Sequence, residues 1–228
     1  MVAENQRAAH LEKGDRKGLI TGVPMLGRMT SIARPASGLV CPPKDRSLPL
    51  VDTALDDSHV TSEPVTLERI ERESAPILGN LLELYAHDFS EILPLTLRES
   101  GRFDLSFGDA WWTRDDHFPF FIRVGGRLAG FALVRRGSRL TASDDVMDVA
   151  EFFVIRGVRR LGVGTRAAHA VFARFPGSWE VRVRRANAPA MKFWARALEG
   201  WLGRAATSGS LSFEGVDWNV FRIDPPRG

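Results

Sequence analysis

The stretch from Val149 to Thr165 constrains the fold of this 228-residue chain more than any other part of it. Its first residues, as far as Ile155, are apolar except for Glu151, and a short run rich in Val, Ile and Phe predicts a buried strand. A turn rich in Arg and Gly follows, and then the Ala-rich segment 165–175 predicts a helix. A strand, a glycine loop and a helix in succession present the free N–H groups of a helix N-terminus, which favour an anion.

The glycines of this turn indicate a phosphate site of an uncommon kind. Gly162 and Gly164 have no Cβ, so a phosphate can approach the backbone closely. The turn is not a P-loop, which needs GxxxxGK followed by Ser or Thr, and it lacks the GxGxxG of a dinucleotide-binding fold. What stands here is Arg159-x-x-Gly162-x-Gly164.

The residues before this stretch predict strands and helices in alternation. We expect a strand at 65–70, a helix at 73–92 with Pro76 in its first turn, and a short second helix at 95–100. Two strand-like runs, 120–124 and 127–135, are joined by Gly125-Gly126, which is typical of a tight hairpin.

The residues after the stretch complete the pattern. Segment 179–185 alternates between apolar and charged residues, which predicts a half-exposed strand. Asn187 is placed to cap a helix that Gly200 and Gly203 end, and a hairpin of 211–213 and 216–223 closes the chain. An antiparallel hairpin combined with βα units gives an α/β or α+β class around one mixed sheet, with no internal repeat.

Two motifs placed on this order of elements resemble the GCN5-related N-acetyltransferase (GNAT) superfamily. In that family Arg or Gln, two residues, Gly, one residue and Gly or Ala follow the central strand, as in Arg159 to Gly164. An Asn then opens the helix after the fifth strand and precedes an Ala and an aromatic pair, as in Asn187-x-x-Ala190-x-x-Phe193-Trp194. The resemblance covers about residues 64–224 and implies the family's fold, a central mixed β-sheet flanked by helices.

The resemblance also implies an acetyl-CoA site. Backbone groups at the end of the central strand would meet the pantetheine arm, N–H groups of the glycine loop would hold the pyrophosphate, and Asn187 would contact the pantetheine. The implied cofactor-binding residues are Phe153, Val154, Ile155, Arg159, Arg160, Leu161, Gly162, Val163, Gly164, Thr165, Asn187 and Trp194. Asn187 is equally an ordinary N-cap, and Trp194 is equally a core residue.

One residue departs from the family pattern. Trp194 stands where the family often has a Tyr that protonates the departing CoA thiolate. An indole N–H has no useful acidity, so the general acid is left open, and water can protonate the thiolate.

The candidate general base is Glu151, on the central strand. A carboxylate among apolar neighbours is expected to be partly buried, which raises its pKa toward the range that a base needs. A structural ion pair with an Arg explains Glu151 equally well, and Asp148 is the alternative base.

The acceptor side of this family is built from the first helices and the loop that follows them. The candidate substrate-binding residues there are Tyr85, Asp88 and Trp112, although Tyr85 and Trp112 also suit simple packing. Acidic residues would attract a cationic amine. Residues 63–155 hold 10 basic and 16 acidic residues, whereas 156–204 hold 11 basic and 2 acidic, which suits the phosphates of CoA or a nucleic acid.

The rest of the sequence indicates the domain boundaries and the cellular location. Residues 1–62 lack periodicity and predict a disordered or loosely attached extension before a domain at 63–228. No apolar run approaches the ~20 residues of a membrane helix, and no secretory signal is visible. The single cysteine, Cys41, excludes an internal disulfide, and no metal-ligand cluster is seen. We expect a cytoplasmic protein without a metal or a membrane partner. A homodimer is among the states that the sequence allows.

The predicted function is an N-acetyltransferase that moves an acetyl group from acetyl-CoA to a primary amine by direct attack in a ternary complex. The acceptor is expected to be a small-molecule or peptidic amine. Transfer of another acyl group, transfer to a protein amine, and a CoA-binding module without turnover stay open as alternatives. A nucleic-acid binder is disfavoured, because no RNA-module or helix-turn-helix pattern is present.

Overall fold

The computed structural model describes residues 57–138, 143–213 and 215–224, so Cys41 and the predicted extension as far as residue 56 lie outside it. Within these residues one sheet of seven strands has the order β1-β2-β3-β4-β5-β7-β6. Every neighbouring pair is antiparallel except β4 and β5. The strands are β1 (Val65–Arg69), β2 (His117–Val124), β3 (Arg127–Arg136), β4 (Val146–Val154), β5 (Ser178–Arg184), β6 (Ser208–Phe213) and β7 (Val216–Ile223).

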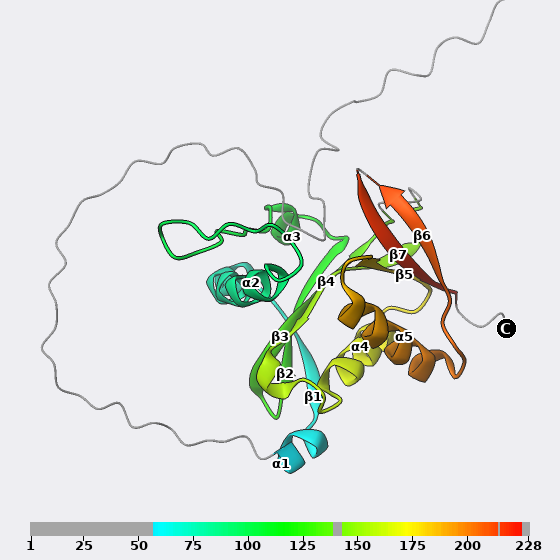
Figure 1. Cartoon of the computed structure of the whole chain (residues 1–228). Helices are drawn as coiled ribbons and strands as arrows, with labels where there is room; N and C mark the ends of the chain where they lie inside the picture. The colour runs from blue at the N-terminus through cyan, green and yellow to red at the C-terminus, as the bar shows by residue number, and fades with distance from the viewer. Residues whose placement is uncertain (1–56, 139–142, 214, 225–228) are drawn as a thin grey trace, which may run out of the picture.

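Helices cover both faces of this sheet (Figure 1). Helices α2 (Ala75–Phe89) and α3 (Ala110–Thr113) lie on one face, and α4 (Val163–Arg174) and α5 (Ala188–Leu202) lie on the other. A short helix α1 (Asp57–Ser62) precedes β1, and 3-10 turns occupy Arg72–Ser74 and Arg156–Val158. Each face therefore has its own apolar core, and the mixed sheet flanked by helices is the predicted fold.

The local signals of the sequence account for most of these boundaries. Gly125 and Gly126 have φ values of 53° and 82°, which are the positive values that a two-residue primed turn between β2 and β3 requires. Asn187 caps α5 by accepting a hydrogen bond from the N–H of Ala190 at 3.1 Å, and Gly203 ends the helix in the left-handed conformation. Gly200, predicted to share that ending, lies inside the helix.

The predicted helix at 95–100 is wrong. The segment is irregular, and in the loop that follows it the N–H groups of Phe103 and Asp104 donate to the carboxylate of Glu83 on α2. Leu97 is 56% exposed, so the segment buries no apolar face that could stabilise a helix. The short helix of this region is α3, further along the chain.

The predicted helix at 73–92 is α2, which is shorter at both ends. Leu78, Leu81, Leu82 and Tyr85 of this helix are buried, whereas Ile77 and Leu84 are exposed. The apolar face of α2 is thus narrower than its composition indicates.

The pair of β4 and β5 is the shortest in the middle of the sheet. The parallel register runs over only four residue pairs, from Val146–Ser178 to Val149–Val181. Beyond them β4 continues to Val154 and β5 to Arg184 without pairing to each other. The two strands therefore part in the middle of the sheet.

Candidate active site

A cavity of about 90 Å³ lies where β4 and β5 part. Residues from both strands, from α2 and from α5 line it. They are Tyr85, Phe89, Val149, Ala150, Glu151, Phe152, Val181, Arg182, Val183, Arg184, Asn187, Ala190, Trp194 and Trp218.

A β-bulge at Ala150 turns Glu151 toward α2. Val149 lies opposite Val134 and Glu151 lies opposite Leu133, so Ala150 has no partner on β3. Side chains alternate between the two faces of a strand, and without the bulge Glu151 would share the face of Val149. With the bulge it shares the face of Leu133, which packs in the core beneath α2.

Glu151 meets Tyr85 on that face. The Tyr85 hydroxyl donates a hydrogen bond to Oε2 of Glu151, and both side chains are buried. Burial raises the pKa of Glu151 to about 7, although the hydrogen bond from Tyr85 and the charge of Arg182 act in the opposite direction. A carboxyl group with this pKa is partly ionised at neutral pH and can accept a proton there.

The alternative base, Asp148, lies in a different environment. Arg135 and Arg182 both donate hydrogen bonds to its Oδ2 atom, at 2.6 and 2.7 Å. Burial alone would raise the pKa of Asp148, but the two guanidinium groups hold it below its usual value. Asp148 is therefore a buried ion-pair partner, whereas Glu151 forms no ion pair within the described residues.

The glycine loop connects β4 to α4. Arg160 has a φ of 67° and Gly162 a φ of 75°, so two left-handed residues turn the chain into the helix. Arg160 is not a glycine, and a non-glycine residue in this conformation is uncommon and often marks a functional site. No side chain caps α4, and its first turn holds no acidic residue. The loop thus leaves a helix N-terminus to an anion.

Arg159 ties the glycine loop to the neighbouring elements. Its Nε atom donates to the carbonyl oxygen of Val154 at 2.7 Å, and its guanidinium group pairs with Asp88 at the end of α2. Arg156 binds the same carboxylate at 2.7 Å. The predicted cofactor residue Arg159 therefore joins the loop to α2, and the predicted acceptor residue Asp88 is bound by two arginines.

A family model described as "Acetyltransferase (GNAT) family" matches residues 79–199, which is more than half of the chain. The chain belongs to the GNAT acetyltransferase family. It is an acetyl-CoA-dependent N-acetyltransferase, and it contains both motifs on the elements that the resemblance implied.

Solved GNAT structures share the fold at low sequence identity. An acetyltransferase from Thermus thermophilus is 14% identical, with a TM-score of 0.54, and the match covers 71% of this chain and 97% of that one. The aminoglycoside acetyltransferase AAC(6')-Ib in complex with coenzyme A is 12% identical, with a TM-score of 0.54 and coverage of 71% and 95%. A search of curated protein sequences finds no match.

The predicted cofactor-binding residues at the end of β4 are Phe153, Val154 and Ile155, and their backbone groups point in different directions. The N–H of Ile155 donates to the carbonyl oxygen of Ala129 at 2.9 Å, so it is used within the sheet. Because successive residues of an antiparallel ladder point to alternate sides, the backbone groups of Val154 point away from β3, into the opening beside β5. Phe153 lies opposite Phe131 on β3, and its ring packs against Tyr85.

The predicted site residues on α4 and α5 also have packing roles. Val163 is fully buried, Leu161 is partly buried against the same core, and Gly164 faces the ring of Phe193, which a Cβ would meet at 3.0 Å. Trp194 is 5% exposed and packs edge-on against Phe152. Asn187, Trp194 and Glu151 all line the cavity. Trp112 on α3 is half-buried and packs against the core beneath α2, but it does not line the cavity.

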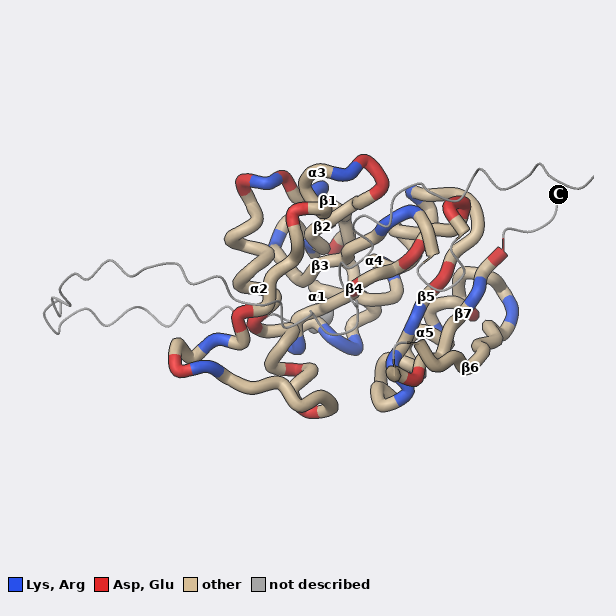
Figure 2. The backbone as a smooth tube through the Cα atoms, turned by 90° about the horizontal axis from the view of Figure 1, so that it is seen from above, with Lys and Arg blue, Asp and Glu red and all other residues tan. Residues whose placement is uncertain are grey.

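Sequence reasoning missed the burial of the charged face of β5. The alternation of 179–185 predicts a half-exposed strand, but Glu180 is 2% exposed and the Arg182 side chain 4% exposed. Figure 2 shows basic positions along β5, beside α5 and β7. Arg184, the last residue of the strand, lines the cavity together with Trp218 of β7, over whose ring its guanidinium group lies at 5.3 Å. The alternation of apolar and charged residues in the sequence reveals that β5 has a charged face. The burial of that face depends on contacts with residues distant in sequence, which the alternation does not reveal.

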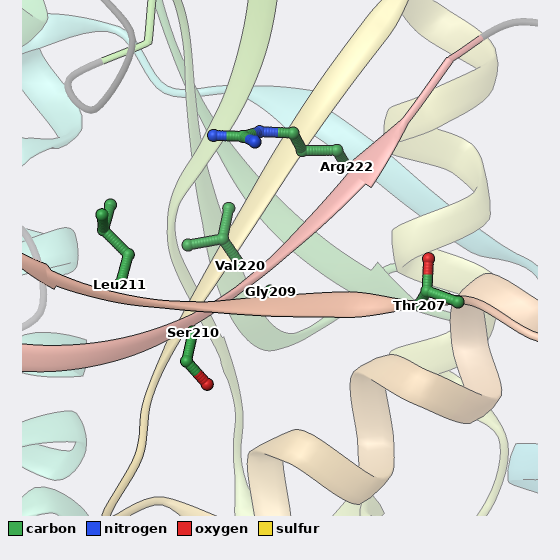
Figure 3. Close-up of a pocket in the computed structure, with 6 residues that line it drawn as sticks. All are labelled: Thr207, Gly209, Ser210, Leu211, Val220 and Arg222. Atoms are coloured by element: carbon green, nitrogen blue, oxygen red, sulfur yellow. The ribbon is translucent and has the colours of Figure 1, made fainter.

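A second and larger hollow, of about 280 Å³, lies over the hairpin of β6 and β7 (Figure 3). Its lining residues are Thr207, Gly209, Ser210, Leu211, Val220 and Arg222. Arg222 is bonded to the buried Glu180, and the lining contains no carboxylate, His or Cys side chain.

The described residues hold no group of three His, Cys, Asp or Glu side chains placed to bind a metal ion. No helix in the described part of the chain has the length and apolar character needed to cross a membrane.

Proposed function

We propose that this acetyltransferase acts by direct attack of a primary amine in a ternary complex, with Glu151 as the general base. One observation carries the proposal. A buried carboxyl group, with a pKa raised to about 7, lies in the cavity where β4 and β5 part, on the strand that leads into the glycine loop. Proton transfer to a positioned base contributes roughly 10²–10⁴-fold to a rate, and a base works best with a pKa near the operating pH.

The residues of the glycine loop and of β4 fit acetyl-CoA. The uncapped N-terminus of α4, the left-handed Gly162 and the absence of acidic residues from the first turn suit a pyrophosphate. The backbone N–H of Val154, whose carbonyl oxygen is already bonded to Arg159, and the side chain of Asn187 suit the pantetheine arm. Bound acetyl-CoA supplies the thioester, whose C–S bond breaks as the C–N bond of the product amide forms.

Glu151 takes the proton that the attacking amine nitrogen loses. Tyr85 fixes the carboxylate through its hydrogen bond, which leaves the other carboxylate oxygen, Oε1, to receive this proton. Burial and the charge of Glu151 raise the pKa of Tyr85 well above its ordinary value, so Tyr85 keeps its own proton and acts as a positioning residue. Trp194 has no acidic proton, and the departing thiolate takes its proton from solvent.

The acceptor in this proposal is a small-molecule or peptidic amine. The expected cationic charge of the acceptor stays a prediction from the sequence. Asp88, one of the residues on which it was based, is engaged by Arg156 and Arg159, and Tyr85 is engaged by Glu151.

The test is the pH profile of Glu151→Gln, measured as thiol release from acetyl-CoA with a panel of primary amines. In the wild type, kcat/KM should rise with pH through about 7, because Glu151 must lose its proton to act as a base. In the variant the step near pH 7 should disappear, and the rate above it should fall by about 10²-fold.

Two controls separate this role from damage to the fold. Glu199→Gln makes the same chemical change at an exposed position on α5 and should leave the profile unchanged. Isothermal titration of acetyl-CoA should give the same affinity for wild type and Glu151→Gln, because Glu151 lies outside the glycine loop. A Glu151→Gln enzyme that keeps the wild-type rate and the wild-type step would show that another group takes the proton.

A further inference from the structure

Arg184 is the unusual charge of the cavity. It lies at the end of β5 and is half-buried, and its Nε atom is buried without a hydrogen-bond partner in the described part of the chain. Its guanidinium group lies over Trp218, which is 3% exposed. Burial lowers the pKa of Arg184, although Tyr85 and Glu151 act to raise it. A buried donor without a partner is destabilising, and more so when it is charged, so such a group points to a missing partner.

The other arginines on this face of the sheet have carboxylate partners. Arg135 and Arg182 share Asp148, and Arg222 binds Glu180 at 3.2 Å. No ion pair joins Arg184 to a carboxylate among the described residues. Glu151, which lines the same cavity, is bonded to Tyr85 and is only partly ionised at neutral pH because its pKa is about 7. The cavity thus holds one more cation than its carboxylates balance.

Strand geometry places Arg184 on the acceptor side of the sheet. Residues at 180, 182 and 184 share one face of β5, and Glu180 lies beside Asp148 of β4 on that face. The bulge turns Glu151 to the same face, which α2 covers. Helix α4 and the glycine loop begin on the opposite face. An anion held by Arg184 would therefore lie next to the base and away from the site suited to the CoA phosphates.

We propose that Arg184 binds a carboxylate on the acceptor, so that the substrate is a small amino acid whose amine and carboxylate enter the cavity together. The inference rests on the proposed function, since it places the acceptor amine at Glu151. A planar guanidinium group can form two parallel hydrogen bonds to a carboxylate, and that of Arg184 is held over the Trp218 ring, 5.3 Å from its centroid. A cavity of about 90 Å³ that contains both Glu151 and Arg184 limits the spacing between the two substrate groups.

The competing role for Arg184 is that of a counter-charge for Glu151. In that role its loss would change the base and lower the rates of all acceptors equally. Binding of the acceptor carboxylate would instead make the loss specific to acceptors that carry one. The two roles therefore predict different effects on the ratio of the rate for an acceptor with a carboxylate to the rate for an acceptor without one.

The test compares each amino acid with its own amide. Glycine and glycinamide, and β-alanine and β-alaninamide, are assayed by thiol release, and the acid-to-amide ratio of kcat/KM is measured for wild type, Arg184→Gln and Arg184→Lys. The ratio should favour the acids in the wild type and fall by at least about 10-fold in Arg184→Gln, because the charge-assisted hydrogen bonds to the substrate carboxylate are lost. Lys keeps the positive charge but lacks the planar pair of donors, so the ratio for Arg184→Lys should lie between those of the wild type and Arg184→Gln. Arg185→Gln, at the next residue and exposed, is the matched control and should keep the wild-type ratio.

The outcomes against the inference are definite. A wild type that uses amides as well as acids, or an Arg184→Gln variant in which both rates fall equally, overturns it. If no amine of the panel reacts, the binding of N-acetylglycine and N-acetylglycinamide to the CoA-loaded protein decides. Binding of the acid that is lost in Arg184→Gln supports the inference, and no binding of the acid refutes it. Failure of the proposed function looks different, because Glu151→Gln would then be fully active while the preference for acids remained.

Discussion

Replacing Glu151 with Gln should make the protein more stable at neutral pH while it removes the proposed base. In the folded protein burial raises the pKa of Glu151 from its ordinary value of 4.5 to about 7. Between these two values the unfolded chain releases a proton that the folded chain retains, so the free energy of unfolding falls as pH rises. A difference of about 2.5 pKa units corresponds to about 3 kcal/mol, since each unit is worth about 1.36 kcal/mol.

The measurement is the free energy of unfolding in urea for wild type and Glu151→Gln at pH values from 4 to 8. The stability of the variant minus that of the wild type should grow by about 3 kcal/mol between pH 4.5 and pH 7.5 and stay constant outside this window. Taking the difference cancels all other titrating groups. Glu199→Gln, at an exposed position, should give a difference that is small and independent of pH. A constant difference for Glu151→Gln would refute the claim that burial holds this carboxyl protonated.

Two further predictions concern glycines. A Cβ on Gly130 of β3 would overlap the backbone carbonyl oxygen of Phe153, so Gly130→Ala should lower the free energy of unfolding by about 3 kcal/mol. Gly79 lies in α2, and a Cβ there would meet no other atom, so Gly79→Ala should raise the free energy of unfolding by about 1 kcal/mol. Equal effects of the two substitutions in urea unfolding would contradict the close approach of Gly130 to Phe153. Gly162→Ala forces an L-residue to a φ of 75°, which costs roughly 1–2 kcal/mol, and should weaken acetyl-CoA binding at least tenfold in isothermal titration. Gly157, in the same loop, has no positive φ and room for a Cβ, so Gly157→Ala should bind acetyl-CoA with the wild-type affinity. Equal acetyl-CoA affinities of the two variants would show that binding does not require the left-handed conformation of Gly162.

The sequence predicted the parts of the fold that local chemistry decides. The turn at Gly125 and Gly126, the cap at Asn187 and the short apolar run of β4 are set by backbone conformation or by nearest neighbours, and the structure confirms them. The predicted helix at 95–100 failed because Glu83, distant in sequence, binds the backbone of the loop that follows it.

The candidate site was predictable in its residues but less so in their geometry. Glu151 and the glycine loop were found from composition and spacing, whereas the bulge at Ala150 follows from the register with β3, which a single sequence does not contain. The same holds for Arg184, whose Trp218 partner arrives on the last strand of the chain. Alternation revealed the charged face of β5 but could not reveal that this face is buried.

The short parallel seam between β4 and β5 has a consequence for biosynthesis. The chain emerges from the ribosome with its N-terminus first, so β1 to β4 and α2 are complete before β5 and the hairpin of β6 and β7 exist. During this interval β4, which carries apolar residues such as Met147 and Val149, is an edge strand, because the three strands that complete the sheet beyond it do not yet exist. Unpaired apolar edges promote aggregation. Nascent chains that stall shortly before Ser178 should therefore depend more on chaperones than chains that have passed Ile223.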